Sequence, residues 1–141
     1  MSRYISNALK EKIRQQAKFR CGYCLRSELL IGMPMEFEHL IPLALGGQTV
    51  EENLWLSCRR CNEFKGIQIQ GFDLETSENA PLFNPRTQVW SEHFSWSMDG
   101  TEVIGLTPIG RVTVNTLNLN EEIIVVTRRL WVSVGWFPPE D

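Results

Sequence analysis

The sequence lacks any apolar run near the roughly 18–20 residues that a membrane-spanning helix needs. Its first residues, MSRYISNALKEK, lack the apolar segment and cleavage site of a secretory leader. Internal repeats and low-complexity tracts are also missing. We therefore expect a cytoplasmic protein with no membrane partner, and stable disulfides are rare in that compartment.

Cysteine is scarce, with only four in 141 residues, and all four occur in two CxxC pairs. Two such pairs supply the four soft ligands of a tetrahedral zinc ion. The 33 residues between the pairs leave room for two strands. Four unrelated buried cysteines are one alternative, and a redox pair is another, although redox chemistry needs only one CxxC. We expect a closed, structural zinc site formed by Cys21, Cys24, Cys58 and Cys61.

The chain as a whole lacks the positive charge that usually accompanies nucleic-acid binding, because its net charge is −3. The charge is unevenly distributed. Residues 1–27 contain seven basic residues and one acidic residue, whereas residues 70–141 contain four basic and ten acidic residues. The basic start could face a nucleic acid or could simply be a solvated helix surface. With 43% apolar and 22% charged residues, the composition is that of a globular protein.

Local patterns predict both helices and strands. Residues 6–20 have helical spacing of apolar residues, with Ser6 or Asn7 as the cap, and residues 35–39 predict a short strand. A second helix is expected within residues 60–69. Residues 71–87, rich in glycine, proline and asparagine, predict a loop or linker.

The remainder predicts a hairpin followed by helices. Residues 88–97 alternate apolar and polar side chains and should pair with residues 101–106 across a turn at residues 98–100. Thr107 and Pro108 predict a helix start. Asn120 predicts the cap of a last helix, although a β-branched run after it favours a strand. His93 and four tryptophans are expected to pack in the core: Trp90, Trp96, Trp131 and Trp136.

A second set of polar residues occurs in residues 37–66, between and just after the cysteine pairs. At these positions the sequence resembles the HNH endonuclease family. The family signature is an acidic residue and histidine, a proline and Gly-Gly loop, Asn-Leu, CxxC, histidine or asparagine, and lysine. The matching residues here are Glu38-His39, Pro42, Gly46-Gly47, Asn53-Leu54, Cys58/Cys61, Asn62 and Lys65.

The resemblance implies a role for each polar residue. His39 would be the general base, since a neutral histidine can take a proton from water near pH 7. Glu38 and Asn62 would hold a single catalytic cation. Asn53 would clamp the loop that orients His39, since a carboxamide both donates and accepts.

The two expected cation ligands depart from the usual family pattern. Glu38 stands where aspartate is more frequent, and Asn62 stands where the family often has histidine. Both supply oxygen, which favours a hard cation such as magnesium or manganese, with nickel or zinc as the alternatives.

Basic side chains near the motif are candidates for phosphate contacts. One group is on the predicted first helix, and the other lies within and just after the second cysteine pair. Each could instead be an ordinary solvated charge. The candidates are Lys12, Arg14, Lys18, Arg59, Arg60 and Lys65.

These observations predict an α+β protein with a treble-clef ββα-metal core, a structural four-cysteine zinc, and a C-terminal β-hairpin and helices. Residues 1–70 would form the basic helix and catalytic core, and residues 71–141 a C-terminal extension packed on it. Residues 81–120 are similar to an extension found in a subset of bacterial, often cyanobacterial, HNH proteins.

The expected function is metal-dependent hydrolysis of phosphodiester bonds in DNA, without strong sequence preference. The alternative is a zinc-stabilised DNA- or protein-binding module that acts within a larger complex and does not cut. The oligomeric state is left open. A complete Glu38, His39, Asn53 and Asn62 set favours the enzyme.

Overall fold

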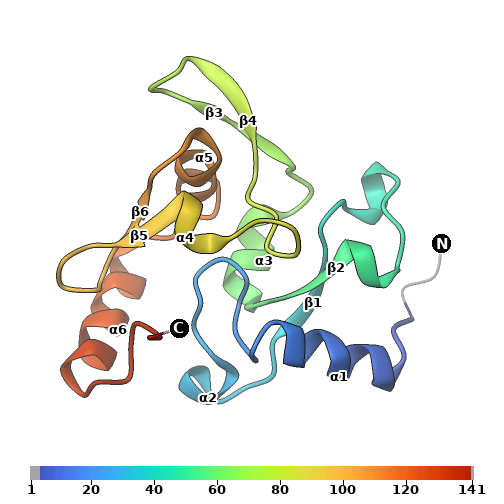
Figure 1. Ribbon diagram of the computed structural model, residues 1–141, viewed down its shortest axis with the longest axis horizontal. Coiled ribbons are helices and arrows are strands. Elements are labelled where there is room, and N and C mark those ends of the chain that lie inside the picture. The colour runs from blue at the N-terminus through green and yellow to red at the C-terminus, as the bar shows by residue number, and fades with distance from the viewer. Residues whose placement is uncertain (1–3, 141) are drawn as a thin grey trace.

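The computed structural model describes residues 4–140, so Arg3 of the basic start lies outside the described part. It has the predicted α+β fold, in which strands form two-stranded antiparallel sheets and helices pack around them (Figure 1). None of the described helices could cross a membrane. In chain order the elements are α1 (Asn7–Gln16), α2 (Glu28–Ile31), β1 (Glu36–His39), β2 (Leu54–Ser57), α3 (Arg59–Lys65), β3 (Gln70–Asp73), β4 (Glu78–Pro81), α4 (Trp90–His93), β5 (Phe94–Trp96), β6 (Val103–Gly105), α5 (Pro108–Thr116) and α6 (Glu122–Ser133).

Helix α1 begins where the sequence predicts but ends early. The hydroxyl of Ser6 caps it by accepting a hydrogen bond from the Leu9 amide at 3.2 Å. The helix stops at Gln16, four residues before the predicted end. Lys18 and Phe19 adopt positive φ angles of 56° and 59°, which no helix can continue.

The predicted strand and helix of the motif are both confirmed and form a ββα unit. Strand β1 pairs antiparallel with β2, and this register places His39 opposite Leu54. Helix α3 follows directly, and the sulfur of Cys58 caps it by accepting from the Cys61 amide at 3.3 Å. The second CxxC pair is therefore also the start of α3.

The linker predicted for residues 71–87 is wrong, because β3 and β4 form a hairpin there. The hairpin extends away from the rest of the fold (Figure 1). It is held on α5 by Asp73, whose two oxygens accept from Arg111 at 2.9 and 3.0 Å. In these strands only Asp73 and Ala80 are buried. The alternation of apolar residues that normally reveals a strand is therefore missing.

The strand predicted for residues 88–97 is only partly correct. Its first half forms the single-turn helix α4, and β5 takes the second half. The β5–β6 hairpin is confirmed. The indole of Trp90 donates to the Tyr23 carbonyl at 2.9 Å, which ties α4 to the first cysteine turn. Thr107 caps α5 as predicted, by accepting from the Gly110 amide at 3.1 Å.

The predicted cap of the last helix is wrong. The carboxamide of Asn120 instead pairs with the backbone N–H and C=O of Val103, both at 2.8 Å. Glu121 therefore precedes the first helical residue, and the β-branched run lies within α6. Trp136 also departs from expectation, since 65% of it is exposed.

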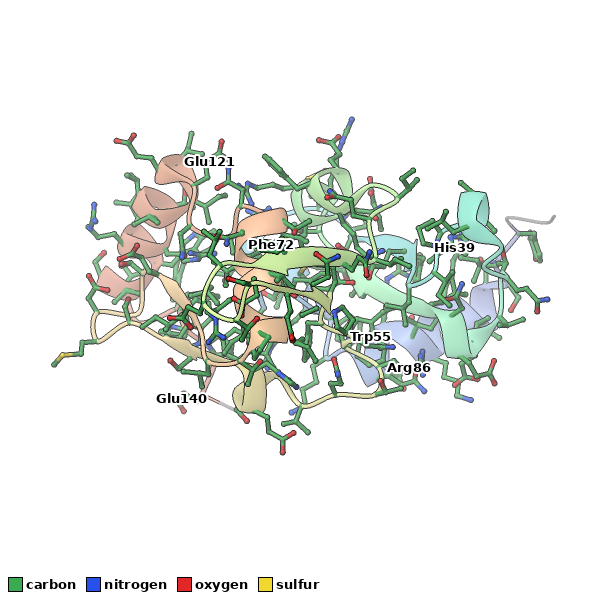
Figure 2. The ribbon with its side chains drawn as sticks, turned by 90° about the horizontal axis from the view of Figure 1, so that it is seen from above. His39, Trp55, Phe72, Arg86, Glu121 and Glu140 are labelled. Carbon is green, nitrogen blue, oxygen red and sulfur yellow. The ribbon has the colours of Figure 1, made fainter. Side chains whose placement is uncertain are left out.

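One buried cluster joins the two parts of the chain. It includes Cys21, Tyr23 and Leu56 from the motif and Phe83 and Phe94 from the C-terminal segment. His39, at the end of β1, and α6 nevertheless lie at opposite ends of the molecule, with His39 near one end and Glu121 near the other (Figure 2). The His39 end is therefore not covered by the C-terminal helix.

Candidate functional site

The four cysteines come together as the sequence predicts. Their sulfur atoms lie within 4.8 Å of one another, and all four side chains are buried. Cys24 Sγ and Cys58 Sγ are 3.8 Å apart. Sulfurs at the corners of a tetrahedron around zinc, with Zn–S bonds of about 2.3 Å, stand about 3.8 Å apart. The cluster is compatible with a structural zinc ion.

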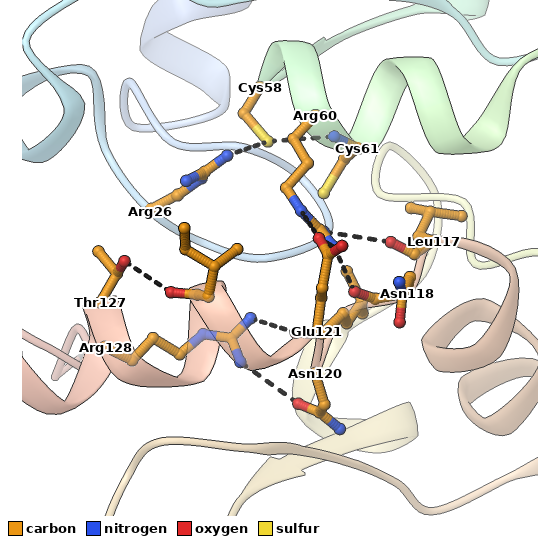
Figure 3. A network of polar contacts seen from close by, with 12 residues as sticks. Arg26, Cys58, Arg60, Cys61, Leu117, Asn118, Asn120, Glu121, Thr127 and Arg128 are labelled. Carbon is orange, nitrogen blue, oxygen red and sulfur yellow. Dashed lines mark hydrogen bonds and ion pairs between the residues drawn. The ribbon is translucent and has the colours of Figure 1, made fainter.

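The surroundings of the cluster favour the ionised form of Cys58, whereas the pKa values of Cys21 and Cys61 are raised. Arg26 donates to Cys58 Sγ at 3.2 Å (Figure 3). Hydrogen bonds from the neighbouring thiols and the charge of Arg26 hold the pKa of Cys58 well below its ordinary value. The buried guanidinium of Arg128 also lies in the field of Cys24 and Cys61. Four thiolates around a divalent ion carry two net negative charges, which these arginines offset.

Asn53 holds the loop between β1 and β2 with three hydrogen bonds. Its Oδ1 accepts from the Ile41 amide at 2.8 Å, and its Nδ2 donates to the carbonyls of Ile41 and Gln48 at 3.0 and 2.9 Å. Gly47 lies against the backbone of Ile41 in the same loop. A Cβ at Gly47 would stand 1.8 Å from the Ile41 carbonyl oxygen, so only glycine fits there.

His39 ends β1 and faces this loop. Its Nε2 lies 2.9 Å from the hydroxyl oxygen of Thr49. Together with Glu38 and Asn62 it lines a cleft of about 420 Å³. The structure therefore brings three of the predicted site residues to one cavity, and places the fourth, Asn53, in the loop behind it.

Glu38 is the buried member of the cleft, with 2% of it exposed. Its Oε1 accepts a hydrogen bond from the Tyr23 hydroxyl. Its Oε2 is buried and has no hydrogen-bond partner among the described residues. Burial raises the pKa of Glu38 to about 7, although the charge of Lys65 and the Tyr23 hydrogen bond oppose that rise.

Asn62 is positioned on α3 by a partner in β1. Its Nδ2 donates to Glu36 Oε1 at 2.8 Å, so its carbonyl oxygen is the atom left for another ligand. A carboxylate oxygen of Glu38 and the carboxamide oxygen of Asn62 suit a small hard cation that keeps several water ligands. The partnerless Oε2 of Glu38 supports this fit, because a buried oxygen without a partner is costly.

Lys65 lies inside the fold rather than on its surface. Only 3% of it is exposed, and its ammonium donates to the carbonyls of His39 and Leu40 at 3.4 and 3.2 Å. A side chain in this position supports the end of β1 but does not reach a phosphate in solvent. Its position therefore does not suit a contact with DNA.

The guanidinium of Arg60 is also held by contacts within the protein. It forms an ion pair with Glu121 at 2.7 Å and donates to the carbonyls of Leu117 and Asn118 at 3.3 and 2.6 Å (Figure 3). It therefore ties the second cysteine pair to the start of α6. Its neighbour Arg59 has a side chain that is 71% exposed.

The basic residues of α1 differ in their surroundings. Lys12 pairs with Glu51 at 3.0 Å. Arg14 lies 5.0 Å above the ring of Phe37, and Lys10 lies 5.9 Å from it. Phe37 also lines the His39 cleft. Lys10, absent from the sequence-based candidates, thus lies beside a residue that lines the cleft, and Lys18 lies beyond the end of α1.

The sequence motif did not reveal Tyr23, Glu36 or Thr49. The sequence does offer one indication of Glu36: residues two apart on a strand share a face, and Glu36 precedes Glu38 by two. Tyr23 lies between the first two cysteines and Thr49 just after the Gly-Gly loop, where nothing in the pattern distinguishes them.

Comparison with known proteins identifies the segment that contains this site. Residues 21–67 match the family described as HNH endonuclease. The match covers all four cysteines and the whole cleft motif from Glu38 to Lys65. No curated protein and no solved structure matches the chain.

Proposed function

Because residues 21–67 form an HNH domain, we propose that this protein is an endonuclease that hydrolyses phosphodiester bonds in DNA. The observation that supports this best is the cleft of about 420 Å³ in which Glu38, His39 and Asn62 meet. It combines a group that can accept a proton with two oxygen ligands for a cation. The catalytic core would comprise residues 1–70, and residues 71–141 would extend and stabilise it.

His39 is the base in this proposal. When its Nε2–H donates to the Thr49 hydroxyl, the neutral ring keeps its lone pair on Nδ1. That atom takes the proton of the attacking water, and Thr49 keeps the ring from rotating. Asn53 contributes indirectly, since it holds the loop that contains Thr49.

Glu38 and Asn62 are the proposed ligands of a magnesium or manganese ion, with nickel or zinc as the alternatives. A bound cation supplies charge stabilisation at the phosphate and the leaving 3′-oxygen. Burial of Glu38 keeps its carboxylate in one position, and Tyr23 fixes the oxygen opposite to the partnerless one. The zinc at the four cysteines holds the fold, because a closed four-thiolate site leaves no position for a substrate.

DNA would approach across α1 and the exposed side of α3. Lys10 and Arg14 lie over Phe37 at the cleft, and Arg59 is exposed on α3. Arg14 also pairs with Glu28 at 3.5 Å and Arg59 with Glu63 at 3.0 Å, so DNA would have to replace these ion pairs. Contacts of this kind are made to phosphate and therefore carry little sequence information.

A plasmid nicking assay on the zinc-loaded protein with added magnesium or manganese tests the proposal. Wild type should convert supercoiled DNA to nicked or linear forms. His39→Ala should lower the rate by about 10²–10⁴, the usual cost of removing a general base. His93→Gln is the matched control, because His93 contacts Thr107, outside the cleft. Cutting by His39→Ala at the wild-type rate would exclude His39 as the general base.

A second candidate is a protein-binding module within a larger complex. The exposed apolar residues of α6 and the segment after it favour it, since Ile123, Leu130 and Trp136 are 65–67% exposed. In that case purified wild type would bind zinc but would nick no DNA with any of the four cations.

A further inference from the structure

We propose that Glu36 is a positioning residue for the catalytic cation: it orients the carboxamide of Asn62 so that the carbonyl oxygen faces the cleft. The inference rests on the proposed function, because it assigns a role to a residue beside the same site. Glu36 lies outside the HNH signature, two residues before Glu38 on β1.

The direction of the Asn62 amide follows from the chemistry of its partner. Glu36 Oε1 and Asn62 Nδ2 are 2.8 Å apart. A carboxylate has only acceptor atoms, so the NH₂ end of the amide must point toward it. The oxygen then points away from Glu36. With an apolar partner, which offers no acceptor oxygen, the amide could turn over and present N–H groups, which repel a cation.

The geometry of the ββα unit explains why Glu36 can do this. Residues 36 and 38 share a face of β1, and α3 packs on this strand. Glu36 therefore contacts Asn62 on α3, while Glu38, two residues later on the same face of β1, lines the cleft. The two carboxylates have different surroundings, since Glu38 is buried and Glu36 is only partly buried.

Three variants separate positioning from direct ligation. Glu36→Ala removes the acceptor. Glu36→Gln keeps an acceptor oxygen but loses the negative charge, so it should still hold the NH₂ end of Asn62. Glu63→Ala is the matched control, because it removes an exposed carboxylate from α3 that pairs with Arg59.

Manganese binding to the zinc-loaded protein, followed by the electron paramagnetic resonance signal of free Mn²⁺, is the readout. Glu36→Ala should weaken Mn²⁺ binding by about 10- to 100-fold, the usual cost of losing a residue that orients a metal ligand. Glu36→Gln should bind within about threefold of wild type, as a single retained hydrogen bond implies. Glu63→Ala should bind like wild type, and all variants should keep zinc and the wild-type Tm.

Each contrary result has a separate meaning. Equal Mn²⁺ affinity in Glu36→Ala and wild type would overturn the positioning role. Equal losses in Glu36→Gln and Glu36→Ala would also overturn it and make Glu36 a ligand or a source of charge. If wild type itself binds no Mn²⁺, the inference fails, whereas the proposed function fails only if wild type also nicks no DNA with any of the four cations.

Discussion

Nε2 of His39 lies 2.9 Å from the hydroxyl oxygen of Thr49, ten residues later in the chain. The contact spans the loop that Asn53 clamps and that Gly47 allows to close. A hydrogen bond at one nitrogen limits the rotation of a histidine ring. The loop between β1 and β2 thus brings the Thr49 hydroxyl to the ring of the proposed base.

Thr49→Val should lower the cleavage rate by about tenfold, because it removes one hydrogen bond from the base while keeping the side-chain shape. The change should affect kcat more than KM, since the ring is misaligned and the DNA surface is untouched. Steady-state nicking kinetics measure both constants. Thr49→Ser is the matched control and should recover most of the rate. A Ser variant as slow as the Val variant would mean that the hydroxyl does not orient His39.

Asn53→Ala should destabilise the fold as well as slow cutting. Three hydrogen bonds disappear, and the carbonyls of Ile41 and Gln48 lose their partner. We expect a loss of about 2 kcal/mol in the free energy of unfolding, measured by denaturant titration. Asn79→Ala, at an exposed position of β4, serves as the control and should have little effect. Unchanged stability in Asn53→Ala would mean that the loop is held by other contacts.

Zinc removal should unfold the core. The four cysteines connect the first turn to the start of α3, so binding of the metal contributes directly to folding. Fresh, reduced protein should contain one zinc per chain by elemental analysis. A strong chelator should abolish the circular dichroism signal of the folded state, and added zinc should restore it. Folded protein without tightly bound metal would contradict the assignment.

Lys10→Glu/Arg14→Glu should weaken DNA binding and flatten its dependence on salt. Each lost phosphate contact lowers the slope of log K against log salt by about one. Fluorescence anisotropy with labelled duplexes of different sequence at several salt concentrations is the measurement. Arg129→Glu, on α6 at the other end of the molecule, should bind like wild type. If the α1 variant binds equally well at low salt, DNA approaches another surface.

The ion pair between Asp73 and Arg111 should make stability depend on pH. Hydrogen bonds from Arg111, followed by those from Thr76, hold the pKa of Asp73 well below its ordinary value. A depressed pKa stabilises the fold at pH values above the unfolded pKa of about 3.9, and this contribution is lost as the pH falls below it.

The Tm difference between wild type and Asp73→Asn should therefore be constant between about pH 5 and pH 8 and should shrink below about pH 4. Wild type and Asp73→Asn have the same cysteine cluster. Loss of zinc at low pH therefore lowers both Tm values equally and does not affect their difference. A difference that does not change with pH would mean that Asp73 contributes through packing alone.

Residue type and spacing were enough to predict several parts of the protein. The two CxxC pairs predicted the four-cysteine cluster, because few other arrangements use four thiols in this pattern. Ser6 and the Thr107-Pro108 pair marked two helix starts, because caps act within one turn. The order of Glu38, His39, Asn53 and Asn62 indicated the motif that the family comparison then identified.

Which side chains meet across long loops depends on the packing of the whole fold. Thr49 reaches His39, and Glu36 reaches Asn62 over 26 residues, through paths that no local preference specifies. Lys65 turned inward because the carbonyls at the end of β1 need donors, whereas its charge alone suggested the surface. The β3–β4 hairpin escaped prediction because its strands are mostly exposed, so α5 and the Asp73–Arg111 pair hold it in place of an apolar face.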